Sequence, residues 1–391
     1  MVVVGAGPVG SNTAALVAQR GFRVALVDRH PRDGKFARCG NLVTPRVLGL
    51  VDACKSVIGE VRGAEVYSPL GRRIVVDGGE TKAVVLDRAR FDSQITDMAV
   101  NNGAKGLFDT TAKGVSRRGD TLEVSLQDET GSRRVSCSIL IGADGPTGRT
   151  GEWFGLSRPK KVLLGCEQTM TGVAGDHRFV KLFVGTEFAP SFFGWIIPDG
   201  RSAKVGLCAD SGNVRAALDK MVSRPCVQQF LRGARPVSYS AGGIPFGFPR
   251  KTYADNVMIV GDAACQVKAT SGGGIFTGLL SSTFCAATAI EALESRDFTS
   301  GNLRSYQKAW MKAIGKELRR DLAIHESYAR LTDKQFEEIF RLVDNPAILD
   351  IITKLGDIDF PSKVGWRLAR EEPRLIKYAG RALRAMLPRL R

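Results

Sequence analysis

Glycines and aspartates recur in three motifs whose residue types suit the binding of a nucleotide. The motifs are Gly5-Ala6-Gly7-Pro8-Val9-Gly10, Ala143-Asp144-Gly145 and Gly261-Asp262-Ala263-Ala264. The first follows a short apolar run and precedes a helix-like stretch, residues 12–19, and a second apolar run that ends at Asp28. Such glycines let the backbone approach a pyrophosphate, the helix start offers free N–H groups, and the acid accepts ribose hydroxyls. The spacing predicts a dinucleotide-binding unit that uses Gly5, Gly7, Gly10 and Asp28.

The other two motifs indicate which dinucleotide is bound. Each follows an apolar run, residues 139–141 or 257–260, that predicts a strand buried on both faces. A nicotinamide-binding domain gives no reason for these acids, whereas flavoproteins of the aromatic-hydroxylase superfamily carry both motifs, and the chain resembles that group. The resemblance implies FAD, with Asp262 at the ribityl chain. The following helix would start at Gly274 and Ile275, where its amides stabilise negative charge on the flavin ring.

Length and pattern predict how the chain is organised. A chain of 391 residues suits two or three lobes. We expect an α/β protein with a Rossmann-type FAD-binding domain, an inserted antiparallel-sheet substrate domain and a C-terminal helical region. The expected ranges are 1–58, 82–150 and 240–300 for the FAD-binding domain, 59–81 and 151–239 for the substrate domain, and 301–391 for the helical region.

Local patterns support this organisation. Two β-rich runs flank Pro69-Leu70-Gly71, which predicts a hairpin. Several short β-rich runs between residues 161 and 205 alternate with glycine turns, as in an antiparallel sheet. After residue 300, apolar residues recur at helical spacing, which predicts packing in a core. These residues are Leu303, Tyr306, Trp310, Ile314 and Leu318.

Two segments resemble the geranylgeranyl reductase family, especially its archaeal members that act on digeranylgeranylglycerophospholipids. The segments are Lys35-Phe36-Ala37-Arg38-Cys39-Gly40 and residues 261–281, GDAACQVKATSGGGIFTGLLS. Together with the N-terminal motif and residues 86–92, the resemblance extends over residues 1–290. It implies that Cys39, Gly40 and Leu42 lie near the flavin, that Arg88 contacts FAD and that a backbone group at Ala112 meets the adenine.

The family's aromatic signature, YxWxFP, is altered in this chain. It appears as Phe193-Gly194-Trp195-Ile196-Ile197-Pro198, without the tyrosine hydroxyl and the second ring. Asn41 and Leu42 follow Gly40 where the family often has a further glycine. The segment from Trp195 to Pro198 also resembles part of the flavin halogenase signature. Phe192, Phe193 and Trp195 are expected either to line a prenyl tunnel or to form ordinary sheet core.

The resemblance implies saturation of an isolated alkene, which needs a hydride at one carbon and a proton at the other. Reduced FAD supplies the hydride, and a dry apolar tunnel holds the alkene against the ring. Cys39 is the candidate proton donor; the alternative is that it is a small side chain packed beside the cofactor. No second GxGxxG motif follows a strand, so the electron donor stays open among NAD(P)H, a ferredoxin and a quinol.

Two other functions fit part of this pattern. A flavin-dependent monooxygenase or halogenase would use the same scaffold with oxygen, and a non-catalytic FAD protein would bind membranes or act as a sensor. Metal chemistry is not expected, because the eight cysteines form no CxxC pair and the three histidines form no ligand pattern. Unpaired thiols favour a reducing, cytosol-like compartment.

Charge is distributed unevenly, and this points to a membrane surface. The net charge is +16, yet residues 301–362 hold equal numbers of basic and acidic side chains, whereas residues 363–391 hold nine basic and two acidic ones. On a helix, residues 376–391 would separate into an apolar and a basic face, which suits contact with anionic lipid; a solvated terminal helix is the alternative.

This charge pattern has a second interpretation, nucleic-acid binding, which we do not expect because no nucleic-acid-binding motif accompanies it. No stretch of about 20 residues is continuously apolar, and no basic segment precedes the first strand, so neither a membrane-spanning helix nor a secretory signal is expected. The expected location is cytoplasmic, peripheral at the inner face of the cell membrane, with a prenylated lipid as substrate.

Overall fold

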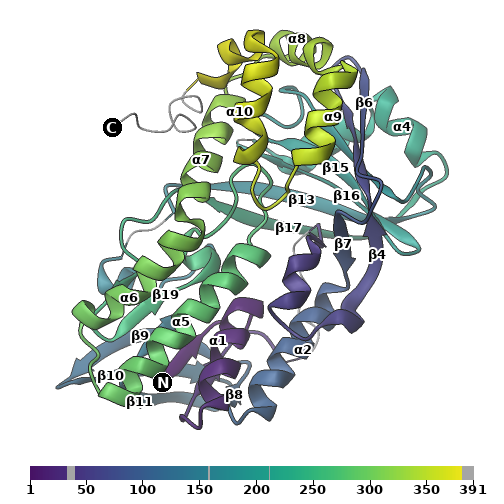
Figure 1. The fold of residues 1–391 in the computed structure, drawn as a ribbon. Coiled ribbons are helices and arrows are strands. Elements are labelled where there is room, and N and C mark those ends of the chain that lie inside the picture. The colour runs from purple at the N-terminus through teal and green to yellow at the C-terminus, as the bar shows by residue number, and fades with distance from the viewer. Residues whose placement is uncertain (33–39, 157–158, 211, 381–391) are drawn as a thin grey trace.

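A mostly parallel sheet forms the centre of the lower half of the molecule in Figure 1. The computed structural model describes residues 1–32, 40–156, 159–210 and 212–380. The sheet order is β18-β19-β12-β1-β2-β8, and each neighbouring pair is parallel except β18 and β19. Its strands are β1 Val2–Val4, β2 Ala25–Val27, β8 Lys105–Leu107, β12 Leu140–Gly142, β18 Tyr253–Ala254 and β19 Val257–Ile259. The central strands are buried on both faces, which explains their continuous apolar runs.

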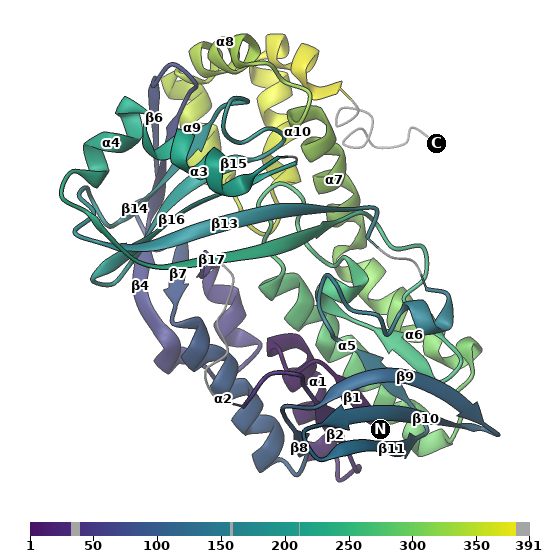
Figure 2. The same cartoon turned by 180° about the vertical axis from the view of Figure 1, so that it is seen from behind.

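Each face of this sheet is covered by a different layer. Helices pack on one face: α1 Pro8–Gln19, α5 Ile275–Ser295 and α6 Ser300–Trp310, with α2 Arg88–Asn101 beside α1. A three-stranded antiparallel sheet covers the other face, as Figure 2 shows: β9 Thr111–Arg118, β10 Thr121–Asp128 and β11 Gly131–Cys137. This is the Rossmann-type FAD-binding arrangement expected from the glycine motifs.

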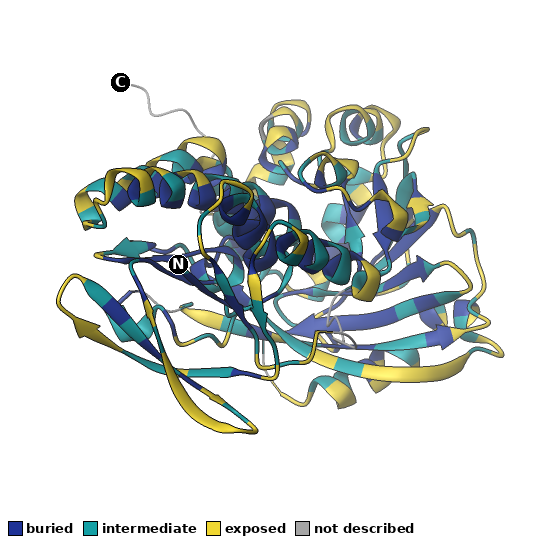
Figure 3. Cartoon of the chain, turned by 90° about the horizontal axis from the view of Figure 1, so that it is seen from below, coloured by how far each residue is buried: buried dark blue, intermediate teal, exposed yellow. Residues whose placement is uncertain are grey.

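Helix α5 is the one helix in the described part of the chain whose length and composition would allow it to cross a membrane. Of its most apolar 18-residue window, 56% is buried inside the protein. It lies between α1 and α6, and the helices at the centre of Figure 3 are dark blue where they pack on the sheet. Its apolar composition is therefore explained by its position in the core.

A seven-stranded sheet forms the upper half of the molecule, with the strand order β17-β13-β16-β15-β14-β5-β6. Its strands are β5 Gly63–Tyr67, β6 Arg73–Asp77, β13 Lys161–Thr171, β14 Phe179–Val184, β15 Phe193–Asp199, β16 Ser202–Ala209 and β17 Arg235–Phe246. The predicted hairpin is confirmed as β5–β6. The expectation of an antiparallel sheet needs one correction: β5 pairs with β14 in parallel, because the hairpin comes from an earlier part of the chain and docks beside β14.

Helices α3 Val214–Val222 and α4 Pro225–Leu231 cover one face of this sheet, and its other face is turned toward the parallel sheet. A small sheet, β3 Leu42–Val43, β7 Ala83–Leu86 and β4 Val57–Val61, lies between the two larger sheets. Strand β17 crosses the boundary that we expected at residue 240. The division of the chain into domains by residue range stays a prediction.

The C-terminal part is helical, as expected. It contains α7 Lys316–Tyr328, α8 Asp333–Val343, α9 Pro346–Leu355 and α10 Ser362–Glu371; the last three lie at the top of Figure 1, and α7 runs up to them. The five apolar residues that predicted a helix packed in a core are all buried: Leu303, Tyr306, Trp310, Ile314 and Leu318. Most of the predicted basic amphipathic tail, residues 381–391, lies outside the described residues.

Candidate functional site

The first glycine motif forms the turn between β1 and α1, and the surroundings of its three glycines explain why larger residues do not occur there. Gly5 has φ +101°, and a Cβ on it would lie 2.2 Å from the carbonyl oxygen of Ala143. A Cβ on Gly10 would lie 1.9 Å from the carbonyl oxygen of Gly5. A Cβ on Gly7, the N-cap of α1, would meet no protein atom within 4 Å. The motif therefore packs tightly on the protein at Gly5 and Gly10 and leaves open space at the helix start, as a bound pyrophosphate requires.

Asp28 lies at the end of β2 and faces this turn. Its Oδ2 accepts a hydrogen bond from the backbone N–H of Ala6 at 2.6 Å, and its Oδ1 accepts one from the N–H of His30 at 2.9 Å. The carbonyl of Asp28 accepts a hydrogen bond from the N–H of Thr110 at 2.9 Å. Because Ala112 follows two residues later, on β9, the chain brings the predicted ribose and adenine contacts to the same end of the parallel sheet.

Asp144 follows β12 and has one satisfied and one unsatisfied oxygen. Oδ2 accepts hydrogen bonds from the N–H groups of Arg149 and Thr150 and from the Thr150 hydroxyl, at 2.8–2.9 Å. Oδ1 is buried and has no hydrogen-bond partner among the described residues. A buried polar atom without a partner costs free energy unless a ligand or water supplies one. Together with the open helix start at Gly7, this oxygen fits a cofactor that carries hydroxyl and phosphate groups.

The third motif meets the first at a single side chain, Val9. A Cβ on Gly261 would lie 3.1 Å from Val9 Cγ1, and a Cβ on Gly278 in α5 would lie 2.7 Å from Val9 Cγ2. The second motif joins them through Ala143, which contacts Gly5. Three motifs that are far apart in the sequence thus converge on one site.

Asp262 stands at the start of the loop that leads to α5. Burial raises the pKa of its carboxyl to about 6, and the guanidinium of Arg88 opposes this shift. A Cβ on Gly274 would lie 2.6 Å from Asp262 Oδ1, so the loop passes directly over the carboxyl, and Ile275 opens the helix. Arg88 itself forms a bidentate ion pair with Asp92, with both N–O distances 3.0 Å.

The aromatic segment lies between two loops that carry predicted flavin contacts. A Cβ on Gly40 would lie 3.9 Å from Trp195 Nε1, and a Cβ on Gly272 would lie 3.5 Å from a ring carbon of Phe192. The rings of Phe192 and Phe193 stack at a centroid distance of 4.3 Å, and Phe193 meets Trp195 edge-on at 6.2 Å. Leu42 packs in the cluster that contains Trp195. Phe192 is buried in the core, whereas Phe193 and Trp195 are partly exposed.

The predicted site residues therefore fall into two neighbouring groups. One contains Gly5, Gly7, Gly10, Asp28 and Ala112; the other contains Gly40, Leu42, Arg88, Asp262, Gly274, Ile275 and the aromatic residues. Cys39, the candidate proton donor, lies outside the described residues. The assignment of these residues to FAD contacts stays a prediction. The described part of the chain has no cluster of three or more metal-binding side chains.

Sequence reasoning missed a buried ion pair that holds the site together. Lys268 Nζ donates to Asp359 Oδ1 at 2.7 Å, and the side chains are 5% and 1% exposed. The other oxygen of Asp359 accepts hydrogen bonds from the Thr44 hydroxyl and from Arg46. The C-terminal region is thereby tied to both loops that border the predicted flavin position. A lysine within a glycine-rich loop was the only sequence signal for this contact.

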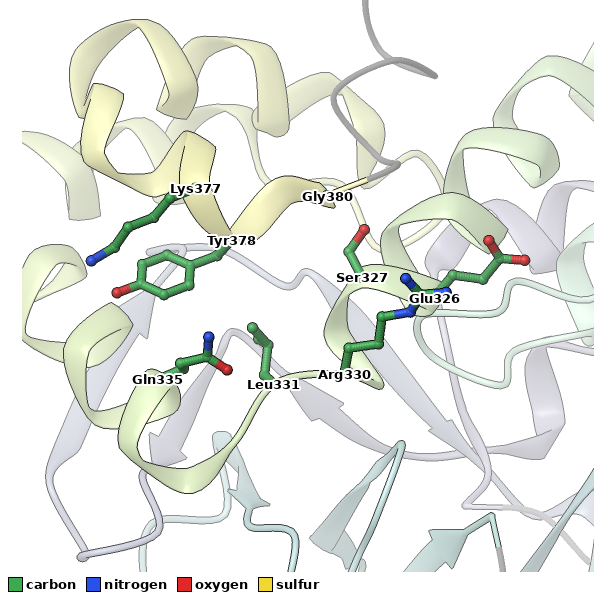
Figure 4. Close-up of a pocket in the computed structure, with 8 residues that line it drawn as sticks. All are labelled: Glu326, Ser327, Arg330, Leu331, Gln335, Lys377, Tyr378 and Gly380. Carbon is green, nitrogen blue, oxygen red and sulfur yellow. The ribbon is translucent and has the colours of Figure 1, made fainter.

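A separate cavity of about 180 Å³ lies among α7, α8 and residues 377–380 (Figure 4). Its lining is mixed, with Arg330, Gln335 and Lys377 beside Leu331 and Tyr378. Lys377 already pairs with Glu338 at 3.2 Å. It is distant along the chain from the glycine motifs and none of the predicted cofactor residues lines it, so we assign it no part in cofactor binding.

Comparison with known proteins supports an FAD-binding fold. The family model described as FAD binding domain matches residues 1–186. Digeranylgeranylglycerophospholipid reductase of Methanothrix thermoacetophila is 30% identical, covering 88% of this chain and 91% of that protein. The reductase of the same name from Methanocaldococcus jannaschii is 28% identical, covering 97% and 96%.

Solved structures share the fold. A geranylgeranyl bacteriochlorophyll reductase-like protein of Thermoplasma acidophilum superposes with a TM-score of 0.85 at 23% identity, covering 97% of this chain and 98% of that one. The flavin-dependent brominase Bmp2 superposes with a TM-score of 0.74 at 16% identity, covering 97% and 98%. The fold and the converging glycine motifs, together with the relatives, identify an FAD-dependent oxidoreductase, and the chain belongs to the digeranylgeranylglycerophospholipid reductase family.

Proposed function

We propose that this protein saturates the C=C bonds of geranylgeranyl chains in archaeal-type membrane lipid precursors. The observation that carries the proposal is the group of aromatic rings, Phe192, Phe193 and Trp195, between the loops at Gly40 and Gly272. An alkene has no polar group for orientation, so an aromatic surface opposite the cofactor is a suitable way to hold it. The names of the relatives support the same substrate class.

Some of the site residues would bind FAD, and others would shield the reacting carbons from water. FAD, once reduced, would supply the hydride. Gly5, Gly7 and Gly10 would cradle the pyrophosphate, Asp28 and the backbone at Ala112 would hold the adenosine end, and Asp262 would hold the ribityl chain. Arg88, Gly40, Leu42 and the start of α5 at Gly274 and Ile275 would border the flavin ring. The aromatic side chains would exclude water from the reacting carbons.

The first prediction separates a reductase from an oxygenase. Chemically reduced enzyme, kept without oxygen and mixed with a digeranylgeranylated glycerophospholipid, should return the flavin to its oxidised spectrum. Mass spectrometry should show products heavier by two hydrogens per double bond. Use of chemically reduced enzyme makes the result independent of the natural electron donor. That donor is then found by testing whether NAD(P)H, a ferredoxin or a quinol reduces the oxidised enzyme.

The alternative function is that of a monooxygenase or halogenase. The flavin-dependent brominase has a similar fold, so this alternative needs a test. Strict dependence on oxygen, with a product that gains an oxygen or a halogen, would replace the proposed function with this alternative. A non-catalytic FAD protein would leave the lipid unchanged under both conditions.

We further propose that the protein works as a peripheral enzyme at the inner face of the cell membrane and that its basic C-terminus contributes to contact. Deleting residues 381–391 removes Arg381, Arg384, Arg389 and Arg391 and no acidic residue. The preceding contacts stay intact, because Lys377 pairs with Glu338 and Ser327 donates to the carbonyl of Ala379.

The second prediction therefore uses this deletion. Full-length protein should sediment with anionic liposomes at low salt and be released at high salt, since each basic residue near such a surface contributes about 1 kcal/mol and the attraction is screened beyond about 8 Å at physiological salt. The shortened protein should stay in the supernatant, and a full-length variant with the four arginines replaced by glutamine should behave like it. Equal sedimentation of all three proteins would exclude this role for the tail.

A further inference from the structure

One face of the seven-stranded sheet is turned toward the flavin loops, and its residues can be assigned from the strand register. Leu163 on β13 packs with Phe192 and Ala269, which precedes the glycine loop. Side chains alternate along a strand, so Glu167, four residues further on β13, lies on the same face. Across the sheet, Glu167 is paired with Gly206, and Gly206 is paired with Trp195.

Gly206 leaves room for its two neighbours to converge. A Cβ at this position would lie 2.6 Å from Glu167 Cβ and 2.8 Å from Trp195 Cε2. The side chains of Glu167 and Trp195 therefore both pack over Gly206, each from a neighbouring strand. Trp195 also borders Gly40 and acts on the Glu167 carboxyl, so Glu167 lies next to the aromatic segment where we propose that the alkene is held.

The carboxyl is buried and incompletely satisfied. Glu167 is 4% exposed, and its Oε2 has no hydrogen-bond partner among the described residues. Its Oε1 has only long contacts, 3.4 Å to the Ser240 hydroxyl and 3.7 Å to Lys204 Nζ. The indole N–H of Trp195 attracts the carboxyl but makes no hydrogen bond of ordinary geometry. An ion pair built for stability would use both oxygens at shorter distances.

The protonation state of this group is set by two opposed effects. Burial raises the pKa of Glu167 to about 7, and the Lys204 ammonium lowers it. Lys204 also acts on Asp199 on β15. Burial raises the pKa of Asp199, and the Lys204 ammonium lowers it. For Glu167, burial has the larger effect, so the pKa of this carboxyl lies well above that of an exposed glutamate in spite of the Lys204 ammonium.

We propose that Glu167 is the proton donor for the alkene, an inference that rests on the proposed function. Its O–H bond breaks as a C–H bond forms at one alkene carbon, and the other carbon receives a hydride, with both electrons, from the reduced flavin. The product is the saturated C–C bond, and the carboxylate that remains is stabilised by Lys204 and reprotonated from water. Glu167 then replaces Cys39 as the candidate proton donor.

The test compares Glu167→Gln with wild type in the reduced, oxygen-free holoenzyme. The rate of flavin reoxidation by the lipid should fall at least 100-fold, within the 10²–10⁴-fold contribution of general acids. FAD content and retention of the lipid should be unchanged, because the amide has nearly the same shape. Independently of turnover, infrared titration of oxidised wild type should show a carboxylic acid band that disappears with a midpoint near pH 7, and Glu167→Gln should lack it.

The pH dependence gives a second readout that a structural role would not change. The wild-type rate should fall as pH rises through 7, because the donor loses its proton. In Lys204→Met the fall should move to higher pH, because the charge that lowers the pKa of Glu167 is gone. Glu167→Asp, which keeps a carboxyl on a shorter side chain, should recover part of the rate.

Glu65→Gln is the matched control. Glu65 is also a buried glutamate of this sheet, but it accepts a hydrogen bond from Tyr67 at 2.7 Å, and Tyr67 packs in the cluster on the opposite face. The rate of flavin reoxidation in Glu65→Gln should equal that of wild type. If wild type saturates the lipid and Glu167→Gln does so equally fast, the donor role is wrong while the proposed function stands. If wild type leaves the alkene unchanged, the proposed function fails first.

Discussion

Gly10→Ala should yield a protein that has lost FAD and unfolds at a lower denaturant concentration than wild type. The added methyl would lie 1.9 Å from the backbone carbonyl of Gly5 and 3.0 Å from Ala143 Cβ. Backbone atoms cannot rotate away, and Gly5 is itself fixed by its φ of +101° and its contact with Ala143. Helix α1 must therefore move off β1, at a cost of at least about 3 kcal/mol, the upper part of the range for overpacked cores. Absorbance at the flavin maximum and urea denaturation of the apoprotein measure the two effects.

Gly7→Ala separates cofactor binding from packing. A Cβ on Gly7 meets no protein atom within 4 Å, and its φ of −69° is ordinary for alanine. The apoprotein should lose at most about 1 kcal/mol, the cost of alanine at an N-cap. FAD affinity should still fall, because the methyl occupies the space that we assign to the pyrophosphate. If Gly7→Ala keeps full FAD affinity, the pyrophosphate lies elsewhere; if Gly10→Ala is as stable as wild type, the close approach of α1 and β1 is wrong.

These two glycines illustrate what the sequence predicts well. The order strand, glycine turn, helix, strand and Asp28 lies within 30 residues, so local rules suffice to predict it. The buried strands before Asp144 and Asp262 are equally visible, because residues covered on both faces form continuous apolar runs. The helical spacing from Leu303 to Leu318 identified a buried face for the same reason.

Contacts between distant strands could not be predicted in this way. The parallel pairing of β5 with β14 joins segments more than 100 residues apart, and no turn residue specifies its direction. The convergence of Glu167 and Trp195 over Gly206 depends on the register of three strands. A glutamate in an otherwise β-rich run was the only sequence signal, and it is equally compatible with a solvent-facing position.

Asp359→Ala should be the most destabilising single substitution of a charged residue in the site. It would leave the Lys268 ammonium, whose side chain is 5% exposed, with the carbonyl of Ile358 at 2.9 Å as its remaining hydrogen-bond partner among the described residues. Removing one member of a buried ion pair typically costs about 3–5 kcal/mol, because the remaining charge stays desolvated. Thr44 and Arg46 would lose the same acceptor. FAD affinity should fall together with the free energy of unfolding, because Asp359 connects the segment after Gly40 with the loop before Gly274.

Two further variants determine whether burial causes this loss. Asp350→Ala breaks a pair with Lys354 whose side chains are 55% and 70% exposed, and it should change the free energy of unfolding by no more than about 1 kcal/mol. The double variant Lys268→Met/Asp359→Leu removes both buried charges and should recover most of the stability lost in Asp359→Ala, since apolar residues of similar volume can replace such a pair. Equal losses in the single and double variants would show that shape at this position, rather than the uncompensated ammonium, sets the stability. Recovery of stability without recovery of FAD affinity would show that the polar connections of Lys268 and Asp359, rather than the stability of the fold, determine FAD binding.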